Sequence, residues 1–258
     1  MNVYFMDCKM KVSIITATYN SAKTVRDTIE SVIAQDYPDI EHIIVDGKSK
    51  DVTLDIVQEY GSRIAKVVSE PDKGIYDAMN KGIRMATGDI IGILNSDDFF
   101  AGSHVISKVA RAFREEPRLD GVHADLYYVK QDEPQKIVRH WVTTDYRPGC
   151  FFKGWHPAHP TLYLRKEVYE RYGLFDLDFP LAADFELMLR LFECHHIVTK
   201  HLDMAMVRMR LGGATSKDYT NLVKNTKECM AAFRKNGLKP SVLYPVYRLL
   251  PKLLQYVK

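Results

Sequence analysis

The sequence has few cysteines and no long apolar run, and both absences limit what the protein can be. Its four cysteines are scattered, which argues against a zinc knuckle or a disulfide framework and favours a reducing compartment. No stretch approaches the roughly 18 consecutive apolar residues of a membrane-spanning helix. No basic segment followed by an apolar core precedes the first predicted strand, as a secretory signal would require. We therefore expect a cytoplasmic protein.

A strong charge bias is also missing. The net charge of +3 is too small to argue for a nucleic-acid partner. A hydrophobic content of 46% and a length of 258 residues fit one globular domain with an appendage. Met10 lies directly before the first predicted strand, so Met1 and Met10 are both candidate translation starts, and residues 1–9 would be a loose leader if translation began at Met10.

Two glycine-dependent phosphate-binding loops are absent. Gly47-Lys48-Ser49 follows a predicted strand, but a P-loop needs glycine at position 42, where the chain has His42. The first strand-to-helix turn, residues 18–21, contains no glycine, so the dinucleotide fingerprint is missing. The chain also lacks the G-x-S-x-G elbow and the H-E-x-x-H motif.

The pattern of apolar segments predicts an α/β fold. Four short apolar runs alternate with helical patterns in the first hundred residues, as in a parallel βαβ sheet. Two later runs joined by a polar turn are more typical of a hairpin, so the complete sheet should be mostly parallel but mixed. The predicted strands cover residues 12–17, 43–45, 64–68, 90–94, 121–129, 136–142, 161–164 and 197–202.

Polar residues follow each of the first four predicted strands, and one edge of a parallel sheet would bring them together. The stretch 88–98 carries the most informative pair, since Asp97 and Asp98 come directly after a strand that reads as buried. Carboxylate oxygens there suit a hard divalent cation and hence a diphosphate. The alternative is that the pair caps a helix starting near Ser103. The other polar residues are Thr16, Thr18, Tyr19, Asp46, Glu70 and Asp72.

Four motifs follow one another along the chain: Thr-Ala-Thr-Tyr-Asn from Thr16, Val-Asp-Gly-x-Ser-x-Asp-x-Thr from Val45, Glu-Pro-Asp-x-Gly-Ile-Tyr-Asp-Ala-Met-Asn-Lys-Gly from Glu70, and Asn-Ser-Asp-Asp from Asn95. In this order and spacing they resemble the family-2 glycosyltransferases with the GT-A fold, which are inverting enzymes of the bacterial surface-polysaccharide type. The resemblance covers residues 10–215 and implies a nucleotide-sugar donor half (10–100) and an acceptor half (101–215). It implies an enzyme of the hexosyltransferase class.

The resemblance implies roles for five donor-site residues. Tyr19 would stack on or flank the nucleobase, with Thr16 near it. Asp46 would accept a hydrogen bond from the base. Asp72 and Lys81 would line the donor pocket, with Lys81 near the diphosphate. Asp46 together with Tyr19 favours a UDP-sugar over a GDP-sugar.

The resemblance also implies a metal ion and a general base. Residues 95–97 occupy the place of the family's Asp-x-Asp motif, but asparagine replaces the first acid, so Mn²⁺ or Mg²⁺ would rest mainly on Asp97, with Asp98 as the second candidate. The ion would neutralise the leaving diphosphate. Asp184, at the predicted start of a helix, is our choice for the base, with Glu186 next. Asp184 is also placed to cap that helix, and the two roles are compatible.

The sequence allows two interpretations for each of two segments in the acceptor half. In the loop 147–160, His159 would contact the acceptor or be structural, and Trp155 would form a sugar-stacking platform or pack in the core. Residues 212–216 resemble the family's Gly-Gly-x-Ser segment, which would close over the donor phosphates or form a turn.

The C-terminal segment 216–258 is predicted to be a helical appendage. From residue 238 onward it interleaves apolar and basic residues without an acid, which is typical of a membrane-surface helix. The alternative is a helix docked on the catalytic domain or on a second copy in an oligomer. We expect Pro245 and Pro251 to break it into short turns. With membrane binding, the acceptor would be a lipid-linked saccharide and the enzyme would lie at the inner face of the plasma membrane.

Two rival functions predict different features. A sugar-1-phosphate nucleotidyltransferase should carry a loop rich in glycine and arginine after the first strand, and residues 18–20 offer none. A non-catalytic sugar-nucleotide-binding protein would bind the donor without transfer or donor hydrolysis, and the presence of Asp97 and Asp184 argues against it.

Overall fold

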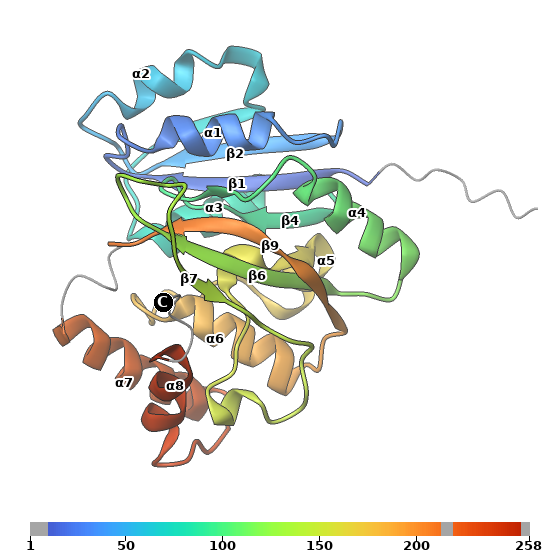
Figure 1. Cartoon of the computed structure of the whole chain (residues 1–258), viewed down its shortest axis with the longest axis vertical. Coiled ribbons are helices and arrows are strands. Elements are labelled where there is room, and N and C mark those ends of the chain that lie inside the picture. The colour runs from blue at the N-terminus through green and yellow to red at the C-terminus, as the bar shows by residue number, and fades with distance from the viewer. Residues whose placement is uncertain (1–9, 213–218, 254–258) are drawn as a thin grey trace, which may run out of the picture.

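The computed structural model describes residues 10–212 and 219–253, and its centre is one mixed β-sheet (Figure 1). The strands follow the order β3-β2-β1-β4-β8-β6-β9-β5, and β7 pairs with β6. The first four are mutually parallel, and β8 joins them antiparallel to β4. The strands are β1 (Val12–Thr18), β2 (Ile40–Asp46), β3 (Lys66–Ser69), β4 (Ile90–Ile93), β5 (Phe99–Phe100), β6 (Gly121–Val129), β7 (Ile137–Trp141), β8 (Tyr163–Arg165) and β9 (Thr199–Arg210).

Helices cover both faces of the sheet, because alternate residues of each central strand point to opposite sides. Ile14 belongs to the apolar cluster of α4, whereas Ile15 packs in the cluster that contains α3 and α6. Helices α1 and α2 pack on Ile44 of β2. The α-helices are α1 (Val25–Ile33), α2 (Thr53–Gln58), α3 (Ile75–Met85), α4 (Val105–Glu115), α5 (Lys166–Tyr172), α6 (Ala183–Leu189), α7 (Tyr219–Lys235) and α8 (Tyr244–Leu253). The short 3₁₀ segments are η1 (Gly61–Arg63), η2 (Phe151–Lys153) and η3 (His159–Thr161), and the π-helix η4 (Arg190–Cys194) continues α6.

The predicted α/β architecture is confirmed, including the parallel first half and the β6–β7 hairpin. Strands β6 and β9 also run parallel to each other, so their carboxyl ends lie at the same edge as those of β1 and β4 (Figure 1). This edge gathers the polar residues that follow the strands.

The last predicted strand, 197–202, differs from the observed one. Strand β9 is twelve residues long and pairs with the unpredicted β5, which follows Asp98 directly. Val52 directly precedes α2, and its side chain is 56% exposed. Helix α1 has no side-chain cap, and the hydroxyl of Ser21 contacts the hydroxyl of Ser96.

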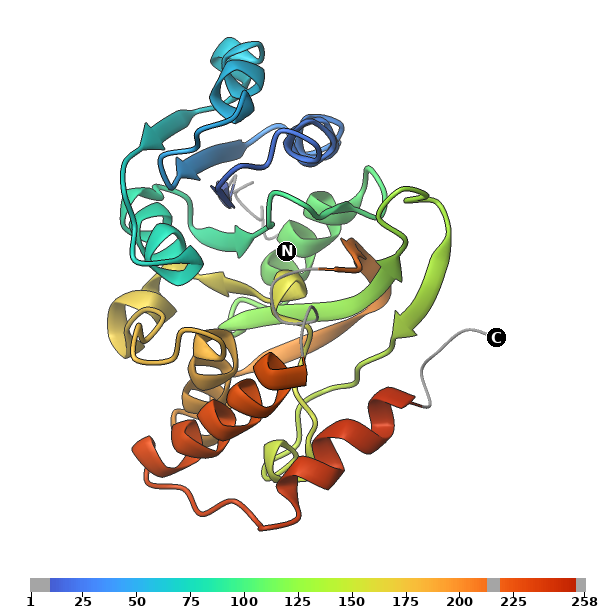
Figure 2. The same ribbon diagram turned by 90° about the vertical axis from the view of Figure 1, so that its left-hand side faces the viewer.

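The C-terminal helices pack against α6, at the opposite end of the molecule from α2 (Figures 1 and 2). Phe233 of α7 and Tyr244 of α8 are fully buried in the same cluster as Phe185 of α6. Helix α8 runs unbroken through both of its prolines, so the expected division into short turns was wrong. Pro245 falls in the first turn, where its missing N–H costs nothing. The division of the chain at residue 215 stays a prediction.

Candidate active site

Asp46 forms the centre of the predicted nucleobase end of the site. Its carboxylate is fully buried at the end of β2 and accepts hydrogen bonds from the hydroxyls of Thr18 (3.0 Å) and Ser69 (2.7 Å) and from the backbone N–H of Ser49 (2.9 Å). Burial alone would raise the pKa of Asp46, but these hydrogen bonds outweigh it and lower the pKa below its ordinary value. Asp46 is therefore a fixed negative charge behind the surface.

Tyr19 and Asp72 lie together in front of this charge. Tyr19 is 58% exposed, so its ring is accessible from solvent. The two meet at Gly47, where an added β-carbon would lie 2.4 Å from Asp72 Oδ2 and 3.5 Å from the Tyr19 ring. A side chain at position 47 would therefore displace the Asp72 carboxylate from its present place. Asp72 also accepts a hydrogen bond from the N–H of Gly74 at 2.9 Å.

Lys81 and Thr16 are held by other protein groups. Lys81 Nζ lies 2.9 Å from Glu70 Oε1 and donates to the carbonyl of Pro71 at 2.8 Å. Lys81 therefore clamps the loop that carries Asp72. Thr16 has no exposed surface, and its hydroxyl lies 3.1 Å from the imidazole of His42 inside the sheet. Burial keeps Thr16 beneath the site rather than at its surface.

The acidic turn after β4 separates its two carboxylates. Asp97 is partly exposed, whereas Asp98 is fully buried and accepts hydrogen bonds from the Asn95 amide and the Arg210 N–H. Burial and the charge of Asp97 raise the pKa of Asp98 well above its ordinary value. Asp98 thus supports the turn and is out of reach of an ion at the surface. It does not cap α4, whose N-terminus shows no side-chain cap.

Arg210, which the sequence analysis did not single out, fastens this turn from the end of β9. Its guanidinium donates to the carbonyl of Asp97 at 2.7 Å, pairs with Asp27 and lies 4.9 Å from the centre of the Phe99 ring. The side chain is 5% exposed. No sequence signal marked Arg210, because its partners lie more than 100 residues earlier in the chain.

Asp184 lies in the first turn of α6, and each of its oxygens has a neighbour. The hydroxyl of Tyr76 donates to Oδ1 at 2.9 Å, and His159 Nδ1 lies 3.4 Å from Oδ2. Burial lowers the pKa of His159, and the negative charges of Asp184 and Asp97 oppose that change. The η3 segment that begins at His159 contacts α6 and β4, so Asp184 lies on an element packed near the strand that leads into the acidic turn.

Glu186 is placed differently. Its carboxylate is 2% exposed and forms two hydrogen bonds with the Arg190 guanidinium, at 2.9 and 3.0 Å, and a third with the Asn236 amide. Arg190 also donates to the carbonyl of Leu174, so this group ties α6 to the preceding loop. Glu186 is a structural carboxylate with no surface for a substrate.

The contacts of Trp155 favour packing in the core over a sugar-stacking platform. Its ring lies 5.6 Å from Phe151 and 6.1 Å from Phe192, both of which are fully buried. Trp155 also lines a cavity of about 330 Å³ together with Asp145, Arg147 and other residues. The Gly-Gly-x-Ser reading concerns residues 212–216, of which 213–216 lie outside the described residues.

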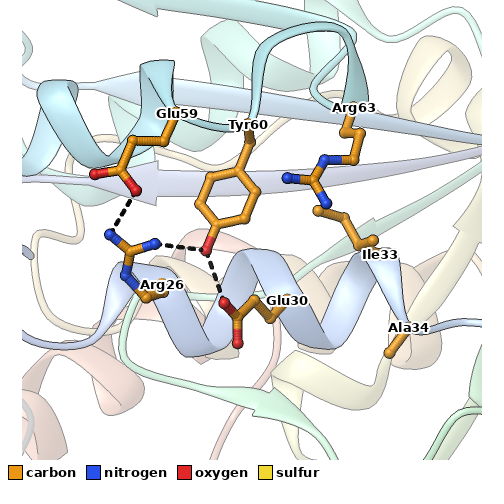
Figure 3. A pocket seen from close by; sticks show the side chains of 7 residues that line it. All are labelled: Arg26, Glu30, Ile33, Ala34, Glu59, Tyr60 and Arg63. Carbon is orange, nitrogen blue, oxygen red and sulfur yellow. Dashed lines mark hydrogen bonds and ion pairs between the residues drawn. The ribbon is translucent and has the colours of Figure 1, made fainter.

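Another cavity, of about 370 Å³, lies between α1 and the segment containing α2 and η1, and none of the predicted site residues lines it (Figure 3). Its charged groups satisfy one another. Arg26 pairs with Glu59 at 2.7 Å, and Tyr60 donates to Glu30 at 3.0 Å. We regard it as the contact between two surface helices.

The residues of the acidic turn fit a divalent cation that arrives with a diphosphate. Mg²⁺ in particular is commonly held by one or two carboxylates, with substrate phosphates and water as the other ligands. Asp97 offers one such carboxylate at the surface. Within residues 10–212 and 219–253, no group of three acidic, histidine or cysteine side chains forms a complete metal site. Over the same residues, no helix is long and apolar enough to cross a membrane.

Comparison with solved structures supports the fold. A mannosyltransferase from Pyrobaculum calidifontis, solved with GDP-Man and Mn²⁺, matches with a TM-score of 0.67 at 19% identity over 95% of this chain and 69% of its own. S. aureus TarS 1-349, solved with UDP, matches with a TM-score of 0.60 at 20% identity over 86% of this chain and 66% of its own. Both likenesses concern the fold.

Sequence relatives identify the family. Residues 13–173 match the description "Glycosyl transferase family 2". An uncharacterised glycosyltransferase from Mycobacterium tuberculosis is 33% identical over 69% of this chain and 68% of its own. A dolichyl N-acetyl-α-D-glucosaminyl phosphate 3-β-D-2,3-diacetamido-2,3-dideoxy-β-D-glucuronosyltransferase from Methanococcus voltae is 31% identical over 70% of this chain and 61% of its own. The chain belongs to glycosyl transferase family 2 and is a glycosyltransferase.

Proposed function

We propose that this enzyme moves a sugar from a UDP-sugar to a hydroxyl of a lipid-linked saccharide, with inversion at the anomeric carbon. The observation that carries the proposal is the place of Asp184: its Oδ2 lies 3.4 Å from His159 Nδ1, and the η3 segment that begins at His159 contacts both α6 and β4, the strand that leads into the acidic turn with Asp97. Asp97 would hold the cation at the diphosphate, and Asp184 would take the proton of the acceptor hydroxyl. TarS was solved with UDP, whereas the mannosyltransferase was solved with GDP-Man, so the nucleobase must be tested directly.

In the proposed reaction, the acceptor oxygen attacks the anomeric carbon from the face opposite the leaving group. The bond from that carbon to the diphosphate oxygen breaks, and UDP leaves with the electron pair. Asp184 takes the proton of the acceptor hydroxyl, so charge does not build up on the attacking oxygen. A single displacement of this kind inverts the configuration.

Asp97 would hold the divalent cation, whose positive charge stabilises the leaving diphosphate. Tyr19 would flank the base in front of the buried charge of Asp46, and Asp72 would line the sugar side of the donor. Lys81 would act by holding the loop of Asp72, because Glu70 and Pro71 already occupy its ammonium group.

The acceptor class follows from the C-terminal surface. The described part of this surface exposes Val242 (88%), Leu243 (50%), Val246 (55%) and Tyr247 (41%) at the start of α8. From position 229 to the end of the sequence there are six lysines and arginines and no acid. Two of these residues are engaged within the protein, because Lys235 pairs with Asp176 and Asp178 and Arg248 is buried. Exposed apolar side chains in a basic segment suit an anionic lipid surface. The Methanococcus relative, whose name describes a dolichyl-linked acceptor, supports the same class.

The division of roles is tested with two variants. In Asp97→Ala, the donor should no longer raise the melting temperature in the presence of Mn²⁺. In Asp184→Asn, the donor should still raise the melting temperature, but the enzyme should no longer release UDP from it. The donor panel is UDP-Glc, UDP-Gal, UDP-GlcNAc and GDP-Man, each with and without Mn²⁺. Equal loss of donor binding in both variants would overturn the assignment.

Membrane contact is tested by sedimentation with vesicles of phosphatidylglycerol or of phosphatidylcholine. We expect binding to the anionic vesicles and a loss of that binding in Val246→Glu. Val52→Glu, which changes an equally exposed valine next to α2, is the matched control. If the wild type stays in the supernatant with anionic vesicles, the surface has another partner.

A further inference from the structure

Helix α3 and the loop before α6 are joined at two points. Asn80 of α3 is 2% exposed, and its side-chain amide bonds to both the carbonyl (2.9 Å) and the N–H (3.0 Å) of Phe175. One turn earlier, the Tyr76 ring lies 5.4 Å from the Phe175 ring, and its hydroxyl donates to Asp184. Residues four apart share a helix face, so α3 presents Tyr76 and Asn80 together to the segment 175–184.

The next residues of α3 serve the donor side. Lys81 and Asp77 lie 3.7 Å apart, and Lys81 holds the loop that carries Asp72. Asp77 accepts a hydrogen bond from the N–H of Lys73 in that loop. One rigid helix of eleven residues therefore fixes the donor loop and the segment that carries the proposed base.

We propose that Tyr76 is a positioning residue, which holds the Asp184 carboxylate in one orientation relative to the donor bound on the other side of α3. This inference rests on the proposed role of Asp184 as the base. Oδ1 is taken by Tyr76 and Oδ2 faces His159, so the carboxylate cannot rotate freely about its last bond. A misplacement of about 1 Å at a reacting group can cost about 10²-fold in rate.

The surroundings of Tyr76 suit a permanent donor. Burial and the negative charge of Asp184 raise the pKa of Tyr76 well above its ordinary value, so the hydroxyl keeps its proton over the whole working range. His159 is the other titratable group that faces the carboxylate, and burial lowers its pKa. The Tyr76 hydroxyl therefore donates its hydrogen bond to Asp184 at every pH near neutrality.

The test compares two Tyr→Phe variants that lose the same kind of bond. Tyr76→Phe removes the donor to Asp184 and keeps the ring on Phe175. Tyr60→Phe removes a hydroxyl that donates to Glu30 at 3.0 Å, far along the chain from the proposed base. We expect kcat for UDP release from UDP-GlcNAc to fall about 10- to 100-fold in Tyr76→Phe. The KM for the donor should be unchanged, and Tyr60→Phe should match the wild type.

A second measurement does not depend on turnover. Carbodiimide labelling of Asp184, followed by mass spectrometry of the native protein, should be faster in Tyr76→Phe than in the wild type and in Tyr60→Phe. Equal labelling rates together with an unchanged kcat would overturn the inference. A rise in the donor KM with constant kcat would do so as well, because it would place Tyr76 in donor binding.

Separate results would contradict the role of Asp184 as the base and the positioning role of Tyr76. If Asp184→Asn keeps wild-type UDP release, the proposed base is wrong, whatever Tyr76 does. If Asp184→Asn is inactive while Tyr76→Phe is fully active, the base stands and the positioning role falls. In the double variant, Tyr76→Phe should add no further loss of rate to Asp184→Asn, because the two groups act as a unit.

Discussion

Replacing Glu41 with glutamine should lower stability strongly without touching the proposed site. Glu41 of β2 is 3% exposed and lies at the amino-terminal end of the parallel strands. It accepts hydrogen bonds from the Ser13 hydroxyl (2.6 Å) and from the N–H and hydroxyl of Thr87 (both 2.8 Å). The ammonium groups of Lys11 and Lys66 lie 3.4 and 3.3 Å away.

The size of the effect follows from the pKa of Glu41. Burial by itself would raise this pKa, but the hydrogen bonds from Ser13 and Thr87 outweigh burial and lower the pKa from 4.5 to about 2. A difference of that size corresponds to about 3 kcal/mol of folding free energy at neutral pH. Glutamine keeps the shape but carries no charge, and its NH₂ group cannot accept the bonds. We expect a melting temperature about 10 °C lower.

The contribution of Glu41 to stability should decrease as the pH falls. Because the folded-state pKa is lowered, the stabilisation is complete above about pH 4.5 and is lost as the pH falls towards 2. The difference between wild type and Glu41→Gln should therefore shrink by more than half between pH 7 and about pH 3. Urea titrations at both pH values measure it. A difference that stays constant with pH, or a variant that unfolds with the wild type, would refute the reasoning.

Three further predictions concern packing and the site. Gly92→Ala should cost about 1–3 kcal/mol of stability in urea titration, because a β-carbon there would lie 2.0 Å from the Tyr163 ring, and an unchanged midpoint would contradict this packing. Arg210→Lys should raise severalfold the Mn²⁺ concentration that supports donor binding, because lysine cannot hold the carbonyl of Asp97 and its other partners at once; an identical Mn²⁺ titration would remove Arg210 from the support of the turn. Glu186→Gln should lower the melting temperature by breaking a buried ion pair, whereas full stability with loss of transfer would make Glu186 the base.

The sequence by itself determined the parallel half of the sheet and the family. Short apolar runs such as 90–94, bounded by turn residues, have few alternatives to a buried strand, and β4 lies where they predict it. The motifs that end these strands are local, so each can be assigned to its strand from the sequence alone, although the sheet places the strands in the order β3-β2-β1-β4 rather than in chain order. Asp97 could be chosen because it comes directly after the apolar run 90–94, whereas Asp184 was chosen from the family resemblance.

Only the tertiary structure decided which polar residues face a ligand and which support the fold. Asp97 and Asp98 are adjacent and chemically identical, yet Arg210 from β9 and the surrounding core bury one and leave the other at the surface. Asp184 and Glu186 are separated in the same way, by Tyr76 and by Arg190. These partners lie in distant segments or one helical turn away, and burial is a property of the whole packed chain. A local sequence pattern therefore cannot predict which of two neighbouring acids is buried.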